Sequence, residues 1–197
     1  MTVGGLVSYS RFMLDVADRS ALLVMDIQPG ILDRVPEPAE FLARAESVVR
    51  AARSHAIPVI HVVVGFRPGM PEVSAQNQSF SALKQQPSAF FIDPRPAIAP
   101  EGNDVVVIKR RVSAFTGSDL EVVLRAGEIR HLVLCGIATS GVVLSTVREA
   151  ADKDYRLTVL ADLCADTDAE VHSVLTTKVF PRQAQVTSAA EWITSLA

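Results

Sequence analysis

The chain has 197 residues, 49% of them hydrophobic, and a formal net charge of -3 at pH 7. This length and composition predict one globular domain, spanning residues 1–197, with a sizeable core. Acidic and basic residues are interspersed, so we expect neither a nucleic-acid partner nor a membrane anchor. Because no cationic leader and no apolar run of about 20 residues occurs, the sequence predicts a cytoplasmic protein that acts on a small molecule.

Six short apolar runs have the composition of strands buried on both faces, because most are nearly continuous in Val, Ile and Leu. In chain order they occupy residues 21–25, 57–64, 105–108, 132–135, 157–161 and 185–187. Helical patterns alternate with these runs at residues 38–55, 119–126, 141–152, 169–180 and 189–196. The alternation predicts an α/β fold: a three-layer α-β-α sandwich around a six-stranded, mostly parallel, Rossmann-like sheet.

Local signals mark the ends of two of these helices. Pro36 and Pro38 suit the start of the first, Ser118 and Glu121 predict a capping box at the start of the second, and Gly127 ends that helix. Residues 65–102 interrupt the alternation, being rich in Pro, Ser, Gln and Asn but also containing Phe80, Phe90 and Phe91. A long connection of this kind inside a compact domain is typical of a lid or a partner surface.

Three of the predicted strands end on residues that suggest a binding site. Asp26 follows the first, Lys109 follows the third, and a turn of small residues, 136–143, follows the fourth. In open α/β sheets ligands bind outside the carboxyl ends of the strands. We therefore expect these residues to form the walls of a pocket.

The sequence predicts no metal and no cofactor. Cys135 and Cys164 lie within or beside apolar runs and are expected to be buried, unreactive thiols. His61 stands alone inside an apolar run, which is typical of a core histidine. No glycine-rich nucleotide-binding pattern follows any predicted strand.

Four segments resemble the isochorismatase-like hydrolase family, also called the cysteine hydrolase superfamily. They are residues 23–28 (LVMDIQ), 107–115 (VIKRRVSAF), 134–140 (LCGIATS) and 160–166 (LADLCAD), and the resemblance is strongest over residues 21–180. It implies a six-stranded parallel sheet, assembly into homodimers or larger homo-oligomers, and a catalytic pair formed by Asp26 and Lys109. It also implies contacts to substrate from Gln28, Phe115, Ile137, Ala138, Thr139, Ser140 and Val142.

The nucleophile of that family is missing from this chain. The resemblance places Val142 where most members carry the reactive Cys, and Ser140 where they carry Asn. An isopropyl group cannot attack a carbonyl carbon, so the covalent amidase mechanism is excluded. Cys135 lies seven residues earlier, inside a predicted strand, and is expected to be inert.

Hydroxyl groups are not expected to replace the thiol. Thr139, Ser140 and Ser145 would each need a positioned base, and none of the four histidines follows one of the three strands. We expect Thr139 or Ser140 to cap the next helix, whose free N–H groups could hold an anion.

The branch of true isochorismatases also lacks the Cys, and residues 109–115 resemble it well. That resemblance implies that the carboxyl of Asp26 protonates an enol ether, which water then hydrolyses. The turn after the fourth strand departs from the branch, which carries Gly where this chain has Val142 and Tyr-Ala-His at residues 138–140.

Other residues near the strand ends have competing interpretations. Asp26 and Lys109 could instead form a buried structural ion pair. Burial raises the pKa of a carboxyl and a nearby ammonium lowers it, so the sequence leaves the role of Asp26 open. Arg110 and Arg111 could bind a carboxylate or be paired at the surface. Asp162 and Asp166 are expected to satisfy turns and a helix start.

Two functional hypotheses follow from the sequence. In the first, the protein is a hydrolase without a Cys nucleophile, in which Asp26 acts as general acid or base beside Lys109. In the second, it is a catalytically inactive binding or scaffold homologue of the same fold.

Overall fold

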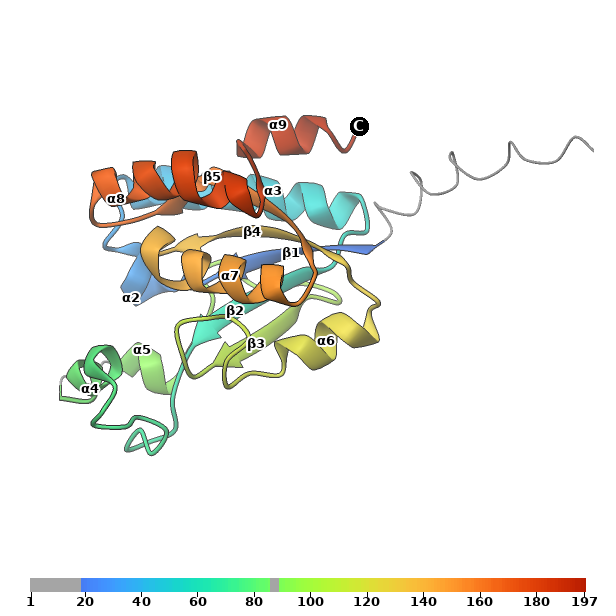
Figure 1. The fold of residues 1–197 in the computed structure, drawn as a ribbon. Coiled ribbons are helices and arrows are strands. Elements are labelled where there is room, and N and C mark those ends of the chain that lie inside the picture. Colours follow the sequence, from blue (N-terminus) through green and yellow to red (C-terminus); the bar gives the residue numbers. More distant parts are fainter. Residues whose placement is uncertain (1–18, 86–88) are drawn as a thin grey trace, which may run out of the picture.

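A computed structural model describes residues 19–85 and 89–197. Its six strands form one parallel sheet in the order β3-β2-β1-β4-β5-β6. The strands are β1 (Ser20–Met25), β2 (Val59–Val64), β3 (Val105–Lys109), β4 (His131–Ile137), β5 (Arg156–Ala165) and β6 (Gln185–Thr187). The predicted α/β fold with a six-stranded sheet is confirmed, and every strand pair is parallel (Figure 1).

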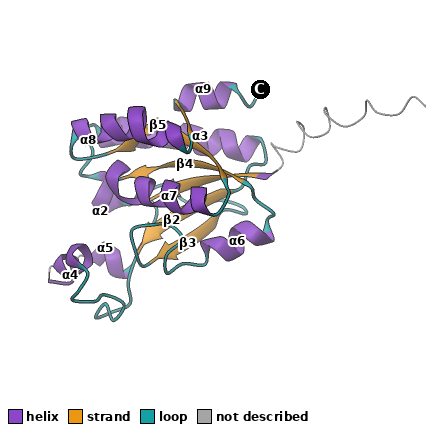
Figure 2. Ribbon diagram, in the orientation of Figure 1, coloured by secondary structure: helices purple, strands orange, loops and turns teal. Residues whose placement is uncertain are grey.

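Helices cover both faces of the sheet (Figure 2). One face packs against α3 (Pro38–Ser54) and α9 (Ala189–Thr194). The other face packs against α6 (Leu120–Ala126), α7 (Leu144–Asp152) and a segment that begins with α8 (Ala169–Val174). That segment continues as a π-helical turn, η3 (Leu175–Val179), and then a 3-10 turn, η4 (Phe180–Arg182). The three-layer sandwich is therefore confirmed.

Alternation along each strand creates the two cores. Leu22 and Val24 of β1 face the α3 side, whereas Leu23 and Met25 face the α6 and α7 side. All six residues of β1 and of β2 are buried, as expected for parallel strands covered on both faces.

The start of α6 corrects one sequence prediction. The N-cap is Asp119, and the Ser118 hydroxyl accepts the N–H of Leu120 at 3.2 Å instead of bonding an N3 amide. Glu121 binds Arg125 and Lys153. The predicted capping box is wrong because the helix begins one residue later than the box requires, and the Glu121 carboxylate bonds these two cations instead of a backbone N–H. Gly127 follows the helix as predicted.

The connection between β2 and β3 has structure of its own. It contains α4 (Gln78–Gln85) and α5 (Ala89–Ile92), and buries a third apolar cluster that includes Phe66, Phe80 and Phe91. Phe66 packs edge-on against the other two rings, with centroids 5.7 and 6.1 Å apart. A further short helix, α2 (Pro29–Leu32), follows β1 and has no counterpart in the predicted elements.

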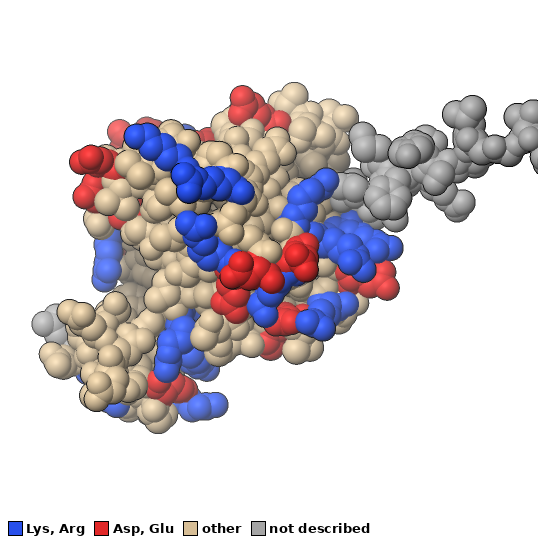
Figure 3. All heavy atoms as spheres, in the orientation of Figure 1, with Lys and Arg blue, Asp and Glu red and all other residues tan. Residues whose placement is uncertain are grey.

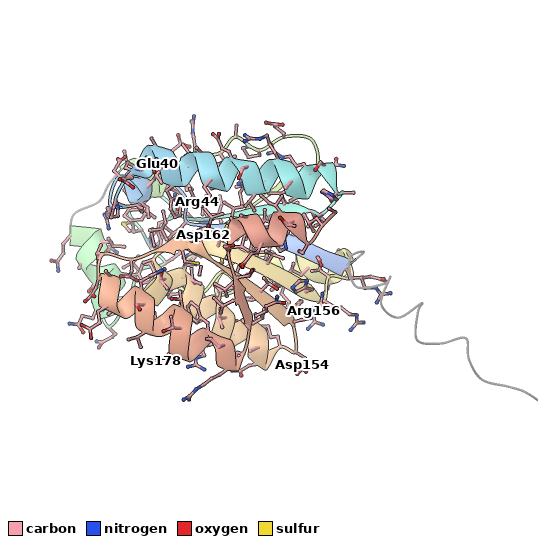
Figure 4. The ribbon with its side chains drawn as sticks, turned by 90° about the horizontal axis from the view of Figure 1, so that it is seen from above. Glu40, Arg44, Asp154, Arg156, Asp162 and Lys178 are labelled. Carbon is pink, nitrogen blue, oxygen red and sulfur yellow. The ribbon has the colours of Figure 1, made fainter. Side chains whose placement is uncertain are left out.

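Asp162 ties the carboxyl-terminal helix to the sheet. Its Oδ1 atom accepts the N–H of Ala189 at 2.7 Å, at the start of α9. Figure 4 shows Asp162 next to Arg44 of α3, whose Nε atom lies 4.0 Å from Oδ2. The prediction that Asp162 satisfies a helix start is confirmed, although β5 extends past residue 161 and includes it.

The surface shown in Figure 3 carries acidic and basic side chains interspersed, without a stripe of one sign. Within residues 19–85 and 89–197, no helix has the length and apolar character needed to span a bilayer.

Candidate active site

The sheet order creates a crevice at the carboxyl ends of β1 and β4. The chain builds β2 and β3 on one side of β1, and β4, β5 and β6 on the other, so the winding direction reverses between β1 and β4. Such a switch point is where open α/β sheets bind ligands. In Figure 1 the carboxyl ends of β1, β2 and β3 point toward the side on which α2, α4 and α5 lie.

Gly136 allows β1 and β4 to meet closely at this point. It pairs with Met25, directly before Asp26, and a Cβ atom built on Gly136 would lie 2.2 Å from the Met25 carbonyl oxygen. Its φ of +156° also disfavours a side chain. A glycine is therefore required for the backbone of the turn after β4 to lie beside Asp26.

Lys109 reaches Asp26 across the end of β2. Asp26 directly follows β1 and Lys109 ends β3, two strands that lie about 10 Å apart, and the lysine side chain brings Nζ to 2.9 Å from Asp26 Oδ2. The same Nζ donates to the carbonyl oxygens of Arg111 and Val112, each at 3.0 Å. An ammonium has three N–H donors, so all of those on Lys109 are engaged.

Asp26 keeps one oxygen free. The residue is 6% exposed, and within the described part of the chain its Oδ1 atom has no hydrogen-bond partner. Burial raises the pKa of the Asp26 carboxyl and outweighs the lowering effect of Lys109. Asp26 is therefore a carboxyl with a raised pKa and with an oxygen available to another molecule.

A cavity of about 360 Å³ lies against this pair. Of the nine predicted site residues, six line it: the catalytic pair Asp26 and Lys109, and Ile137, Ala138, Ser140 and Val142. Eleven further residues complete the wall: Ile31, Arg34, Val35, Val64, Phe80, Leu83, Phe91, Val112, Gly141, Asp166 and Thr167.

Phe80, Leu83 and Phe91 show that the 65–102 segment contributes to the cavity wall. This segment was predicted as a lid or partner surface, but its individual contacts could not be assigned from the sequence. The signal that pointed to it is the presence of phenylalanines, Phe80, Phe90 and Phe91 among them, within a polar stretch.

Gln28, Phe115 and Thr139 do not line the cavity, which departs from what the resemblance implied. The fully buried Gln28 amide donates to the Val64 carbonyl oxygen at 3.3 Å and accepts the Val64 N–H at 2.8 Å. Gln28 therefore joins the start of α2 to the end of β2. Phe115 packs beside Tyr155 in the core, with centroids 6.1 Å apart.

The turn after β4 is held differently from the prediction. It forms a π-helical turn, η2 (Thr139–Val143), in which no side chain of the turn itself caps the N-terminus. Instead, Asp166 Oδ2 accepts the Ser140 N–H at 2.7 Å. The expected cap from Thr139 or Ser140 is therefore wrong, because a carboxylate from the end of β5 takes that place.

Thr139 also has an unforeseen partner. Its Oγ1 atom lies 2.9 Å from Nδ1 of His172, which α8 brings to this turn. Thr139 itself is fully buried. The pair therefore braces the turn, and the Thr139 hydroxyl lies outside the cavity wall.

Two further side chains behave as the sequence indicated. Burial raises the pKa of the Cys135 thiol well above its ordinary value, and its sulfur lies 3.5 Å from the Leu23 carbonyl oxygen. His61 is completely buried, with Nε2 3.2 Å from Asp104 Oδ2. In the described ranges no three His, Cys, Asp or Glu side chains are grouped as a metal site.

Arg110 and Arg111 are both held by the 65–102 segment. The Arg110 guanidinium donates to the Gly65 carbonyl oxygen at 2.6 Å and lies 3.5 Å from the Glu72 carboxylate. Arg111 donates to the Glu72 carbonyl oxygen at 2.9 Å. Neither lines the cavity, and only Arg110 is paired with a carboxylate, because Arg111 bonds backbone carbonyl oxygens instead.

Comparison with known proteins agrees with this geometry. Residues 20–191 match the isochorismatase domain, and the chain is 34% identical over 184 residues to the isochorismatase family protein YecD of Escherichia coli O157:H7, covering 91% of this chain and 97% of that protein. The chain belongs to the isochorismatase family. The predicted family and the predicted class of enzyme, a hydrolase, are thereby confirmed.

Two other relatives extend the comparison. An isochorismatase family protein from Burkholderia thailandensis has the same fold, with a TM-score of 0.78, 32% identity, and coverage of 91% of this chain and 96% of that one. A ureidoacrylate amidohydrolase, RutB of Methylobacterium radiotolerans, is 31% identical over 191 residues, covering 81% of this chain and 72% of that protein.

Proposed function

We propose that this protein hydrolyses a small organic molecule without a covalent intermediate, with Asp26 as the general acid and base and Lys109 as its electrostatic partner. The observation that carries the proposal is the free Oδ1 atom of Asp26, which belongs to a buried residue of the cavity wall. A buried polar atom without a partner costs free energy, and a bound substrate would supply that partner.

The raised pKa of Asp26 supports a role as proton donor. With an enol ether, the carboxyl would protonate the terminal carbon of the double bond and leave an oxocarbenium ion. Water would then add to that cation, and the resulting hemiketal would break into an alcohol and a ketone. The proton released by the water returns to Asp26, so no nucleophile of the protein is consumed.

Lys109 would stabilise the carboxylate that exists after the proton has left Asp26. Its Nζ atom lies 2.9 Å from Oδ2, on the opposite side of the carboxyl from the free oxygen. Because its other two N–H donors bind Arg111 and Val112, it would hold this position throughout the reaction without bonding the substrate.

Val142 argues against the amidase route of other family members. It is 2% exposed, lines the cavity, and offers no nucleophile. The same residue favours the second candidate function, a binding protein that has kept the fold and lost catalysis. The two functions differ in whether Asp26 supports turnover.

The deciding experiment measures pyruvate release from isochorismate. We expect the wild-type protein to release pyruvate and Asp26→Asn to release it at least about a hundredfold more slowly. Asp33→Asn, the same substitution at the exposed residue that follows α2, should change the rate little. Absence of release, or equal release by Asp26→Asn, would contradict the proposed reaction and favour the binding protein.

We further propose that the protein is cytoplasmic and forms a homo-oligomer. Support for assembly comes from β3, an edge strand of the sheet. Its Val106 and Ile108 side chains are 40% and 37% exposed. Apolar side chains on an unpaired edge favour contact with another chain.

A further inference from the structure

Arg34 is the cation of the cavity wall that has no partner. Two of the lining residues are cationic, Lys109 and Arg34. Every donor of the Lys109 ammonium is engaged. Across residues 19–85 and 89–197, the Arg34 guanidinium makes no ion pair or side-chain hydrogen bond. Its five N–H donors are therefore available to a molecule in the cavity.

The backbone beneath Arg34 is fixed, although its side chain is exposed. The Arg34 N–H bonds the Ile31 carbonyl oxygen at 3.1 Å, and the Leu32 N–H bonds the Gln28 carbonyl oxygen at 2.8 Å. Gln28 is in turn joined to β2 through Val64. The guanidinium thus extends from a short turn that is anchored to the sheet beside Asp26.

The rest of the wall is mainly apolar. Phe80, Leu83 and Phe91 contribute from the 65–102 segment, and Val142 from the turn after β4. Besides Asp26, Lys109 and Arg34, the wall has one more charged side chain, that of Asp166. Burial acts to raise its pKa, but hydrogen bonds from Ser140 and from nearby backbone N–H groups outweigh burial and lower it. Asp166 is therefore a fixed negative charge.

We infer that Arg34 binds a carboxylate group of the substrate, and that the substrate is a small carboxylic acid with an apolar body. This inference rests on the proposed function only in taking the cavity as the substrate site. The planar guanidinium matches the two oxygens of a carboxylate. The apolar body would then lie along the Phe80 and Phe91 side, with its reactive end toward Asp26.

The charges of the wall favour a carboxylate over a phosphate ester. A phosphate monoester carries nearly two negative charges at neutral pH and needs several donors. The cavity offers one free guanidinium, and the Asp166 carboxylate would repel a single group that carries two charges. A single carboxylate charge is balanced by Arg34 alone.

The test compares benzoate with benzamide, which has nearly the same shape and no charge, by titration calorimetry at low salt. We expect the wild-type protein to bind benzoate about tenfold or more tightly than benzamide. Arg34→Gln should lose this preference, while Arg34→Lys should keep part of it. Arg182→Gln, which removes an exposed arginine that lines a separate hollow at the amino ends of the strands, should bind as the wild type does.

Equal binding of the two probes, no binding of benzoate, or an unchanged preference in Arg34→Gln would overturn the inference. Asp26→Asn separates it from the proposed function, because that variant should still prefer benzoate. A preference that depends on Arg34 in a protein without pyruvate release would uphold the acid-binding site and reject the proposed reaction. Pyruvate release that depends on Asp26, together with no benzoate preference that depends on Arg34, would reject the acid-binding site alone.

Discussion

Val142 occupies the position where the family resemblance places a thiol, and this one side chain changes what Asp26 must do. In a cysteine enzyme the carboxylate would activate the nucleophile, whereas here the Asp26 carboxyl has a free oxygen and a raised pKa. A residue suited to serve as a base becomes suited to serve as an acid. The difference arises because no group in the described part of the chain donates a hydrogen bond to the Asp26 Oδ1 atom.

Replacing Val142 by Cys tests whether the rest of the site still accommodates a thiol. We expect Val142→Cys to react with iodoacetamide under native conditions and give one added group by intact mass, because the new thiol lines the cavity near Lys109. The loss of stability should be about 1 kcal/mol, since the change in volume is small.

The wild-type protein is the control for this labelling. Burial raises the pKa of Cys164 to about 12 and raises that of Cys135 well above its ordinary value, so neither thiol should react until the protein is unfolded. Labelling of the native wild-type protein would show that a buried thiol is accessible and would contradict this account.

At the scale of elements, the amino ends of β1, β4 and β5 are joined through His131. Its Nδ1 atom lies 2.9 Å from Ser20 Oγ, and its Nε2 atom lies 2.9 Å from Thr158 Oγ1. Burial, and then the nearby charge of Arg156, lowers the pKa of His131 to about 4. The imidazole is therefore neutral in the folded protein at neutral pH.

This arrangement predicts that the free energy of unfolding decreases as the pH is lowered. Between the ordinary pKa of 6.5 and about 4, the unfolded state binds a proton that the folded state does not, so His131 stabilises the fold above pH 6.5 and loses its contribution as the pH falls to 4. The loss should be up to about 3 kcal/mol in urea unfolding. His131→Asn should remove that part of the pH dependence, and His55→Asn, at an exposed position, should retain it.

At the scale of the whole molecule, the sheet was predictable and the long-range contacts of the site were not. All six strands and five of the helices follow from apolar runs and helical periodicity. Asp26 and Lys109 could be placed near each other because parallel strands end at one edge. Periodicity was insufficient for α2, which has only four residues, and for the π-helical turns.

Partners that come from distant segments carried no local signal. The Thr139–His172 contact and the Asp166–Ser140 bond depend on how β5 and α8 lie beside the end of β4. Arg34 was overlooked because its role depends on the wall around it and on the saturation of Lys109. Phe115 and Gln28 were predicted at the substrate, but their contacts are with the core and with β2.

Assembly is a property of the whole molecule that an edge substitution can test. We expect sedimentation velocity to show a homo-oligomer for the wild-type protein. Val106→Lys should shift it toward the monomer, because a charge on the apolar edge of β3 disfavours contact. Val174→Lys, at a similarly exposed position of α8 on the far side of the molecule from β3 (Figure 1), is the matched control and should leave the oligomer unchanged. A wild-type monomer would contradict the expectation.

The most direct test of the central claim is the titration of the Asp26 carboxyl itself, followed by carbon-13 NMR in the protein labelled at Asp and assigned by comparison with Asp26→Asn. We predict a pKa above the ordinary value of an aspartic acid, because burial outweighs Lys109. A pKa at or below the ordinary value would mean that Lys109 dominates, that Asp26 is half of a structural ion pair, and that it cannot be the acid of a hydrolase without a nucleophile.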